Sequence, residues 1–387
     1  MAGGSPNNSV KNLADCSRSR AATMVWLKVM AIPIQSTTVG GGTATLHDVG
    51  MTFDFRDLVH PVVVAPMAGG PSTPELAAAA TRAGGLGFVP AGYLTAEVFA
   101  ERLDAAQQLA SGRVGANLFV PQPSAALPEA IARYSEALAR DAERYGTTLG
   151  EPRFDDDAWA AKLDVLLDLR PAVASFTFGL PSTEEIQRLR AAGITTVGTV
   201  TTLAEAQQAV ARGVDAVAAQ GPAAGGHRGT FDPTAQPSDI PLDALLASLI
   251  ETVDVPVVAA GGLMTAEDVD RVRRAGAVAA QLGTAFLLAD EAGSSVVHRG
   301  ALQDDAFTET AVTKAFSGRY ARGLRNRFID EHEPEAPFGY PEVHYLTSPL
   351  RAAAVRAGDA HGVNVWAGSG FRKVRSGSVA EIFSTLV

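Results

Sequence analysis

The chain has 387 residues, which is enough for two average domains or for one large α/β barrel with additions. Its formal net charge is −10 at pH 7 and no run is rich in lysine and arginine, so nucleic-acid binding is not expected. A small-molecule partner is expected instead. The single cysteine, Cys16, excludes a disulfide framework and a cysteine metal site and is consistent with a reducing cytoplasm.

The first fifty residues differ in composition from the rest, being rich in Ser, Thr, Asn and Gly. This composition predicts an unstructured leader over residues 1–50. An apolar stretch over 21–34 has some features of a secretion signal, but Lys28 interrupts it and no convincing small-residue cleavage site follows. The sequence has no run of about 18 uninterrupted apolar residues, so neither a membrane span nor export is expected and the protein is predicted to be cytoplasmic.

From His60 onward, short apolar runs alternate with helical patterns at the spacing of β–α units. Helix starts carry capping sequences, as at Ser72-Thr73-Pro74-Glu75, and glycines such as Gly84 follow the helices. Eight such units predict the α/β class and a closed (β/α)8 TIM barrel over residues 51–293. The strand-like runs begin at Val62, Leu86, Val114, Ala172, Thr195, Ala216, Val257 and Val278.

One of these units is longer than the others. Between Val120 and Ala172 there is room for two helices, roughly 127–145 and 156–169, which we expect to be inserted after the third strand and to cover the barrel mouth. After Ala289 the clean alternation stops. Residues 294–387 are therefore expected to form a C-terminal cap on the barrel.

In a parallel barrel, the residues that follow the strands meet at one end, where active sites lie. Glycine-containing turns follow the seventh and eighth expected strands, at Gly261-Gly262 and at Gly283-Thr284. The second turn is expected to open a helix, and such a pair of turns is the usual phosphate pocket of these barrels. A phosphate-bearing cofactor is therefore predicted.

Three amide side chains, Asn117, Gln220 and Gln281, stand on or at the ends of expected strands. They offer uncharged donors and acceptors, which suit the edge of a flavin better than a metal or a sugar, and no metal site is predicted. Each amide could instead satisfy backbone groups at its own strand end.

The sixth expected strand opens into a glycine-rich loop that runs from Gln220 to Gly229. Gly225 and Gly226 let backbone N–H groups come close to a ligand, and His227 follows them as a group expected to titrate near neutrality. This order predicts an anion cradle beside an acid or base. A tight turn with an incidental surface histidine is the plainer alternative.

Four motifs resemble those of the flavin-dependent nitronate monooxygenase family, formerly called 2-nitropropane dioxygenases, over most of residues 51–327. They are Ala65-Pro66-Met67-Ala68-Gly69, Ser175-Phe176-Thr177-Phe178-Gly179, the loop 220–229 and Ala259-Ala260-Gly261-Gly262. The resemblance implies an FMN cofactor and a catalytic histidine, His227, that faces the substrate. The cofactor-binding residues that it implies are Ala65, Pro66, Met67, Asn117, Gln220, Gly225, Gly226, Gly262, Gln281, Leu282, Gly283 and Thr284.

The resemblance also implies oxidative denitrification. A nitronate, or the nitroalkane from which it forms, gives an electron to FMN, O2 enters, and a carbonyl compound and nitrite are released, with no metal required. His227 would hydrogen-bond the nitro group or take the α-proton.

The sequence departs from the family pattern in two loops. Ala223 stands where the family commonly has an acidic residue, and Tyr320, in a second motif over 317–323, stands where proline is usual. Arg319 and Arg322 of that motif would either close over the site or form a charge pair on the cap surface.

Two other functions are consistent with the same residues. An NAD(P)H-dependent flavin reductase of the enoyl-acyl-carrier-protein reductase or quinone reductase type would share the barrel and the Gly-Gly-His loop, although no Gly-x-Gly-x-x-Gly fingerprint follows a strand. In a flavin-storing or sensory module, His227 would be only a loop residue.

Overall fold

The computed structural model describes residues 52–387. The leader expected over residues 1–50 lies outside the described residues. Among the described residues, no helix is both long and apolar enough to cross a membrane.

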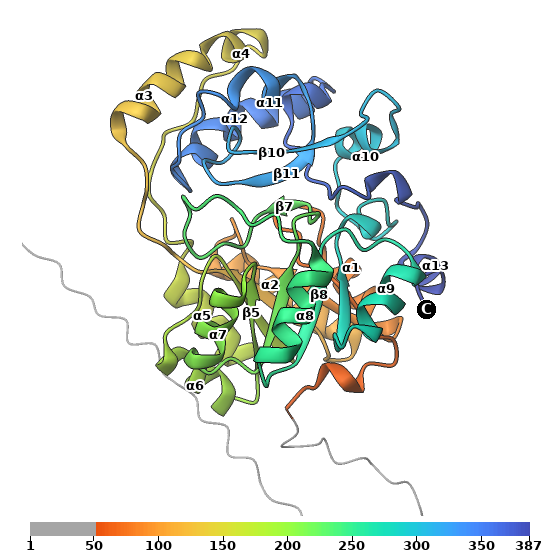
Figure 1. The fold of residues 1–387 in the computed structure, drawn as a ribbon. Helices are drawn as coiled ribbons and strands as arrows, with labels where there is room; N and C mark the ends of the chain where they lie inside the picture. Colours follow the sequence, from red (N-terminus) through yellow and green to blue (C-terminus); the bar gives the residue numbers. More distant parts are fainter. Residues whose placement is uncertain (1–51) are drawn as a thin grey trace, which may run out of the picture. The chain divides into compact units, whose positions relative to one another are not determined.

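Eight parallel strands close into a barrel (Figure 1). Closure is made by β1, where Val63 pairs with Leu86 of β2 on one side and with Gln281 of β9 on the other. Each predicted strand is present within one residue of its expected start, so the predicted TIM barrel is confirmed. The strands are β1 (Val62–Val64), β2 (Leu86–Pro90), β3 (Gly115–Phe119), β4 (Val173–Thr177), β5 (Thr195–Val200), β6 (Ala216–Gln220), β8 (Val257–Ala260) and β9 (Ala279–Leu282).

Both faces of the barrel sheet are buried. Side chains such as Val63, Phe88 and Val258 fill the interior, and Phe55 of the short 3-10 helix η1 (Phe55–Asp57) packs with them. The opposite side chains pack against surrounding helices, which explains why the strands consist of continuous apolar runs. This packing leaves the carboxyl ends of the strands to form a site.

The surrounding helices begin and end where the sequence predicts. Thr73, Ser182 and Thr265 accept hydrogen bonds from the backbone of the first turn of α1, α6 and α9, and Gly84 follows α1 with a φ of +87°. The helices of the barrel are α1 (Pro74–Arg82), α2 (Ala96–Ala110), α5 (Trp159–Leu169), α6 (Thr183–Ala191), α7 (Leu203–Arg212), α8 (Leu242–Thr252) and α9 (Ala266–Arg274).

The insertion is smaller than expected. The helix over 159–169, α5, packs against α2 and α6 and is the barrel's own helix between β3 and β4. Only α3 (Pro128–Ala137) and α4 (Ala139–Arg144) are additional. Tyr134 and Leu138 bury them against the C-terminal region, and neither helix contributes a residue to the cavity described below.

The C-terminal region contains a small sheet that the sequence did not predict. Its antiparallel order is β10 (Thr310–Thr313), β11 (Ala321–Leu324) and β7 (Gly226–His227), and His227 pairs with Ala321. The histidine loop after β6 is therefore part of the cap, which lies beyond the carboxyl ends of the strands in Figure 1. The cap helices are α10 (Val296–Gln303), α11 (Arg327–His332) and α12 (Glu342–Arg356), with the 3-10 helices η3 (Ala360–Gly362) and η4 (Phe371–Lys373).

A cap was expected over residues 294–387, but the last part of this range packs on the barrel. After β9 comes only the 3-10 helix η2 (Thr284–Phe286), not the longer helix expected there. The place beside α1 is taken by α13 (Val379–Ser384), whose Phe383 ring lies 5.5 Å from that of Phe286. Val379 and Phe383 join the barrel core, because otherwise the apolar face of α1 would be open to solvent.

Candidate active site

A cavity of about 380 Å³ lies between the strand ends and the cap, within the size range of small-molecule sites. Every site residue predicted from the sequence lines it: Ala65, Pro66, Met67, Asn117, Gln220, Gly225, Gly226, His227, Gly262, Gln281, Leu282, Gly283 and Thr284. The cap supplies a second wall that the sequence did not predict, with Phe316, Ser317, His344, Arg351, Asn364, Trp366, Gly368 and Gly370.

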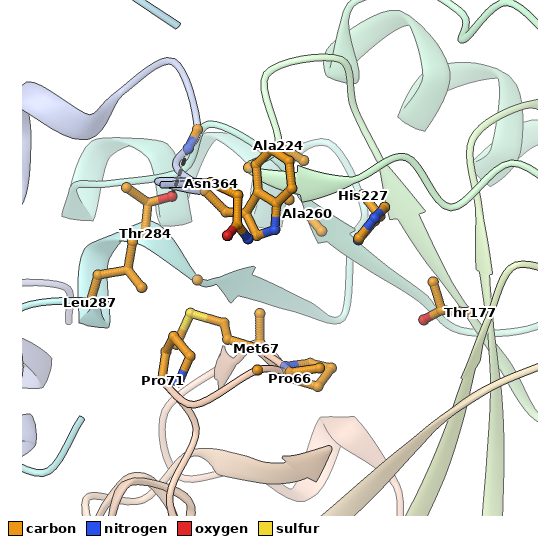
Figure 2. A pocket seen from close by; sticks show the side chains of 18 of the residues that line it. Pro66, Met67, Pro71, Thr177, Ala224, His227, Ala260, Thr284, Leu287 and Asn364 are labelled. Carbon is orange, nitrogen blue, oxygen red and sulfur yellow. Dashed lines mark hydrogen bonds between the residues drawn. The ribbon is translucent and has the colours of Figure 1, made fainter. Parts of the chain in front are cut away.

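The cavity has two ends of different chemistry. In Figure 2, Thr284 and Leu287 lie at one end, and Thr177 and His227 lie at the other. Met67 lies along one long side. A ligand that spans the cavity would meet glycine-rich backbone at the first end and aromatic and imidazole rings at the second.

At the Thr284 end, glycines allow two loops to pack closely. A Cβ on Gly225 would lie 2.4 Å from the backbone N of Gly368, and one on Gly262 would lie 2.7 Å from Cβ of Ala223. The N–H of Gly368 donates to Oγ1 of Thr284 at 2.9 Å. No hydrogen bond within the described residues uses the backbone N–H of Gly262 or of Gly283, so both can bind an anion.

The loop 368–370 was missed by sequence reasoning. Its Gly-Ser-Gly sequence is the same kind of signal as the two turns that were recognised, but it does not follow a barrel strand. The N–H of Ser369 donates to the carbonyl of Ala223 at 3.1 Å, so the backbone of Ala223 holds this loop in place. The side chain of Ala223 does not line the cavity.

The three predicted amides differ in what they already bind. Gln220 is used within its own loop, since Nε2 donates to the His227 carbonyl at 3.0 Å and Oε1 accepts from the Gly229 N–H at 2.8 Å. Asn117 donates from Nδ2 to Oγ of Ser175 at 2.9 Å. The Gln281 side chain forms no hydrogen bond within the described residues, so both its donor and its acceptor can serve a ligand.

His227 lies among aromatic rings at the other end. The ring centroids of Phe178, Tyr340 and Trp366 are 5.7, 5.6 and 5.6 Å from that of the imidazole. Burial, helped by the positive charges of Arg319 and Arg351, lowers the pKa of His227 from 6.5 to about 3. The expectation that His227 titrates near neutrality is therefore wrong, because the groups that bury the ring, and the two arginines that act on it, come from distant parts of the chain.

The hydrogen bonds of Ser317 favour one tautomer of the neutral imidazole. Nε2 of His227 lies 2.8 Å from Oγ of Ser317, and that hydroxyl donates to the carbonyl of Arg319 at 3.2 Å. Since a hydroxyl has a single proton, this arrangement has Nε2–H donating to Ser317. Nδ1 is then left with a free lone pair.

The two arginines of the second motif are structural. Arg319 is 1% exposed, lies under the Phe178 ring at 4.1 Å and donates to Oε1 of Gln122 at 2.7 Å. Arg322 donates from Nε to the carbonyl of Pro222 at 3.0 Å. Neither arginine lines the cavity, and among the described residues neither pairs with a carboxylate, so both alternatives considered for them are wrong. Arg322 instead fastens the histidine loop to the cap, and Arg319 links the cap to Gln122 after β3.

Arg351 is the cationic residue of the cavity wall that sequence reasoning missed. Its guanidinium donates to neutral acceptors, Oγ1 of Thr347 at 3.1 Å and the His344 carbonyl at 2.9 Å, and forms no ion pair within the described residues. Burial lowers its pKa to about 10, so it stays protonated at neutral pH. Its spacing of seven from His344 places both on one face of α12, a signal that only a predicted helix could have revealed.

Buried neutral histidines predict that the protein loses stability in mild acid. Burial holds the pKa of His227 at about 3, that of His298 at about 4, and that of His344 well below 6.5. Below pH 6.5 the unfolded chain binds protons at these sites and the folded chain does not, so the free energy of unfolding should decrease from pH 6.5 toward pH 4.

Thermal unfolding of the wild type and of His298→Gln between pH 4 and 8 measures this effect. The variant lacks one such histidine, so its Tm should depend less steeply on pH below 6.5. Parallel curves would contradict the assignment for His298.

Comparisons with known proteins agree with the fold. A model of the nitronate monooxygenase family matches residues 54–387. A probable nitronate monooxygenase of Staphylococcus aureus (strain Newman) is 35% identical over 335 residues, which cover 85% of this chain and 93% of that protein.

Solved structures give the same picture. The structure of nitroalkane oxidase from Streptomyces ansochromogenes has a TM-score of 0.82 and 48% identity, and the match covers 86% of this chain and 96% of that one. FabK from Thermotoga maritima has a TM-score of 0.66 at 22% identity, with 86% and 93% covered, which shows a shared fold alone.

Proposed function

Since the chain belongs to the nitronate monooxygenase family and is an oxidoreductase, we propose that it uses FMN and O2 to convert alkyl nitronates to carbonyl compounds and nitrite. The observation that carries this proposal is the two-ended cavity. At one end of the cavity, backbone N–H groups without a partner among the described residues form a cradle. At the other end lies a neutral His227, and Arg351, which has no carboxylate partner among the described residues, stands in the same wall. This second end suits a small anion.

The residues of the cavity fit a flavin mononucleotide. Gly262 and Gly283 would bind the phosphate through their N–H groups, and Gln281 would bind the polar edge of the ring. Bound there, the flavin supplies the oxidising centre that accepts an electron from the substrate. The protein's share of catalysis is to orient the substrate, exclude water and provide hydrogen bonds.

The electrostatics favour a nitronate over a neutral nitroalkane. An imidazole whose pKa is about 3 is a weak proton acceptor, whereas the half-buried guanidinium of Arg351, which has no carboxylate partner among the described residues, attracts an anion. A nitronate that already carries the charge needs no base. Oxidation of neutral nitroalkanes is the second candidate, since the free Nδ1 of His227 leaves a proton acceptor in place.

Replacing Gly283 with valine is expected to weaken FMN binding at least tenfold without unfolding the protein. A Cβ at this position would lie no closer than 3.5 Å to atoms outside its chain neighbours and the φ is −107°, so the backbone accepts a side chain, and the valine methyl groups are expected to compete with the proposed phosphate for space. Fluorescence titration of the apoprotein with FMN measures the Kd. Gly300→Ala is the control, because Gly300 lies on α10 with nothing within 4 Å of the added Cβ, and it should bind FMN normally. Equal Kd values for the two variants would mean that the phosphate does not bind at Gly283.

Anaerobic mixing separates the proposed function from the reductase alternative. Ethyl nitronate should reduce the bound flavin, and NAD(P)H should leave it oxidised. Denaturation should release FMN and not FAD. Rapid bleaching by NAD(P)H together with no response to ethyl nitronate would establish the reductase and overturn the proposal.

A further inference from the structure

A buried ion pair lies beside the cavity and takes no part in the function proposed above. Lys162 of α5 is 1% exposed, and its Nζ lies 2.7 Å from Oδ1 of Asp157. The second carboxylate oxygen, Oδ2, has no hydrogen-bond partner among the described residues. The cost of removing these charges from water offsets much of their mutual attraction, so stability alone does not explain the pair.

Asp157 has a second contact, to the backbone of Tyr93. The N–H of Tyr93 donates to Oδ1 of Asp157 at 3.0 Å, across 64 residues of sequence. Tyr93 follows β2 and has a φ of +69°, a left-handed conformation that is unfavourable for a bulky side chain. Such a conformation persists only where the surroundings hold it, and an ionised acceptor makes a stronger hydrogen bond than a neutral one.

The segment that carries Asp157 is itself held in an uncommon backbone conformation. Asp157 and Ala158 have φ values of +56° and +53°. Their N–H groups donate to the side chains of Asp155 and Asp156, at 2.7 and 3.1 Å. Since Asp155 also accepts from the hydroxyl of Tyr345 on α12 at 2.8 Å, the segment connects the barrel rim to the cap.

The Tyr93 side chain forms part of the cavity wall. Its ring stacks on that of His344 with a centroid separation of 4.1 Å and an angle of 2°. Its hydroxyl accepts from the hydroxyl of Tyr340 at 3.2 Å, and no described residue accepts the proton of Tyr93 itself. That proton is free for a ligand, and the Tyr340 ring lies 5.6 Å from His227, which places the phenol pair at the substrate end.

We propose that Asp157, with its charge compensated by Lys162, is a positioning residue that holds Tyr93 in the cavity wall so that the Tyr93 hydroxyl donates to an oxygen of the bound nitronate. The inference rests on the proposed function for the identity of the ligand. The positioning of Tyr93 is independent of it.

Two matched double variants test the positioning role. Lys162→Met with Asp157→Asn removes both charges but keeps an amide oxygen for the Tyr93 N–H, whereas Lys162→Met with Asp157→Leu removes the charges and the acceptor at similar volume. Crystal structures of both should show Tyr93 with a positive φ only in the asparagine variant. This measurement requires no turnover, so its failure would overturn the positioning of Tyr93 whatever the enzyme oxidises.

Kinetics with ethyl nitronate test the consequence. The leucine variant should lose roughly 10- to 100-fold in kcat/KM, as displaced binding groups do, and the asparagine variant should stay within about threefold of the wild type at equal flavin content. In a Tyr93→Phe background the leucine variant should cause little further loss, because the hydroxyl that it positions is already gone. The proposal would be overturned if the leucine variant lost as much kcat/KM in the Tyr93→Phe background as in the wild type, or if the two double variants lost kcat/KM equally. A wild-type enzyme that does not oxidise nitronates would contradict the proposed function alone.

Discussion

Replacing His227 with asparagine is expected to reduce kcat/KM for neutral nitroalkanes by about 10²-fold, the lower end of the range for loss of a general base, because an imidazole whose pKa is about 3 is a weak proton acceptor. The arrangement of Ser317 leaves Nδ1 of His227 as the proton acceptor in the cavity, and an amide cannot replace it in this role. Ethyl nitronate needs no proton abstraction and should be affected much less. Nitrite release from nitroethane and from ethyl nitronate, measured on FMN-loaded enzyme, separates the two effects.

His361→Asn is the control for this substitution, since His361 is exposed and outside the cavity. It should leave both activities unchanged. If the His227 variant lost both activities equally, the histidine would act as an anchor for the nitro group and not as a base. Unchanged turnover with both substrates would remove it from the active site.

Replacing Arg351 with methionine is expected to raise the KM for ethyl nitronate by roughly 10- to 100-fold, as expected for a lost interaction between a charged group and an anion. Arg351 is the half-buried cation of the cavity wall, and no acidic group pairs with it among the described residues. The KM for neutral nitroethane should change little. Steady-state kinetics with both substrates measure the difference.

Arg351→Lys is the matched comparison because it keeps the charge and loses the planar fork of donors. It should recover much of the affinity for nitronate. Equal increases in KM for the anionic and the neutral substrate, in both variants, would mean that Arg351 only supports the fold of α12.

The barrel could be predicted from sequence because its signals are local. Strands buried on both faces are apolar runs, and residues such as Thr73 and Gly84 mark where α1 begins and ends within a few positions. Topology alone predicted that the residues after the strands meet, and the two glycine turns and the three amides all line the cavity. The longer set of cofactor-binding residues came from the family resemblance.

What the sequence did not reveal depends on contacts between distant segments. The strand β7 has two residues and exists only because β11 pairs with it, so no periodicity could indicate it. Likewise α13 has six residues and is identified as a barrel helix by its contact with α1. The low pKa of His227 depends first on its burial and then on the charges of Arg319 and Arg351, and both are properties of the fold.

Nitrite formation from ethyl nitronate in air, followed together with O2 consumption, tests the proposed function most directly. We expect many nitrite molecules per bound FMN, O2 uptake in step with nitrite, and no requirement for NAD(P)H. Absence of nitrite from FMN-loaded enzyme over a range of nitronate concentrations, with O2 uptake only when NAD(P)H is added, would contradict it.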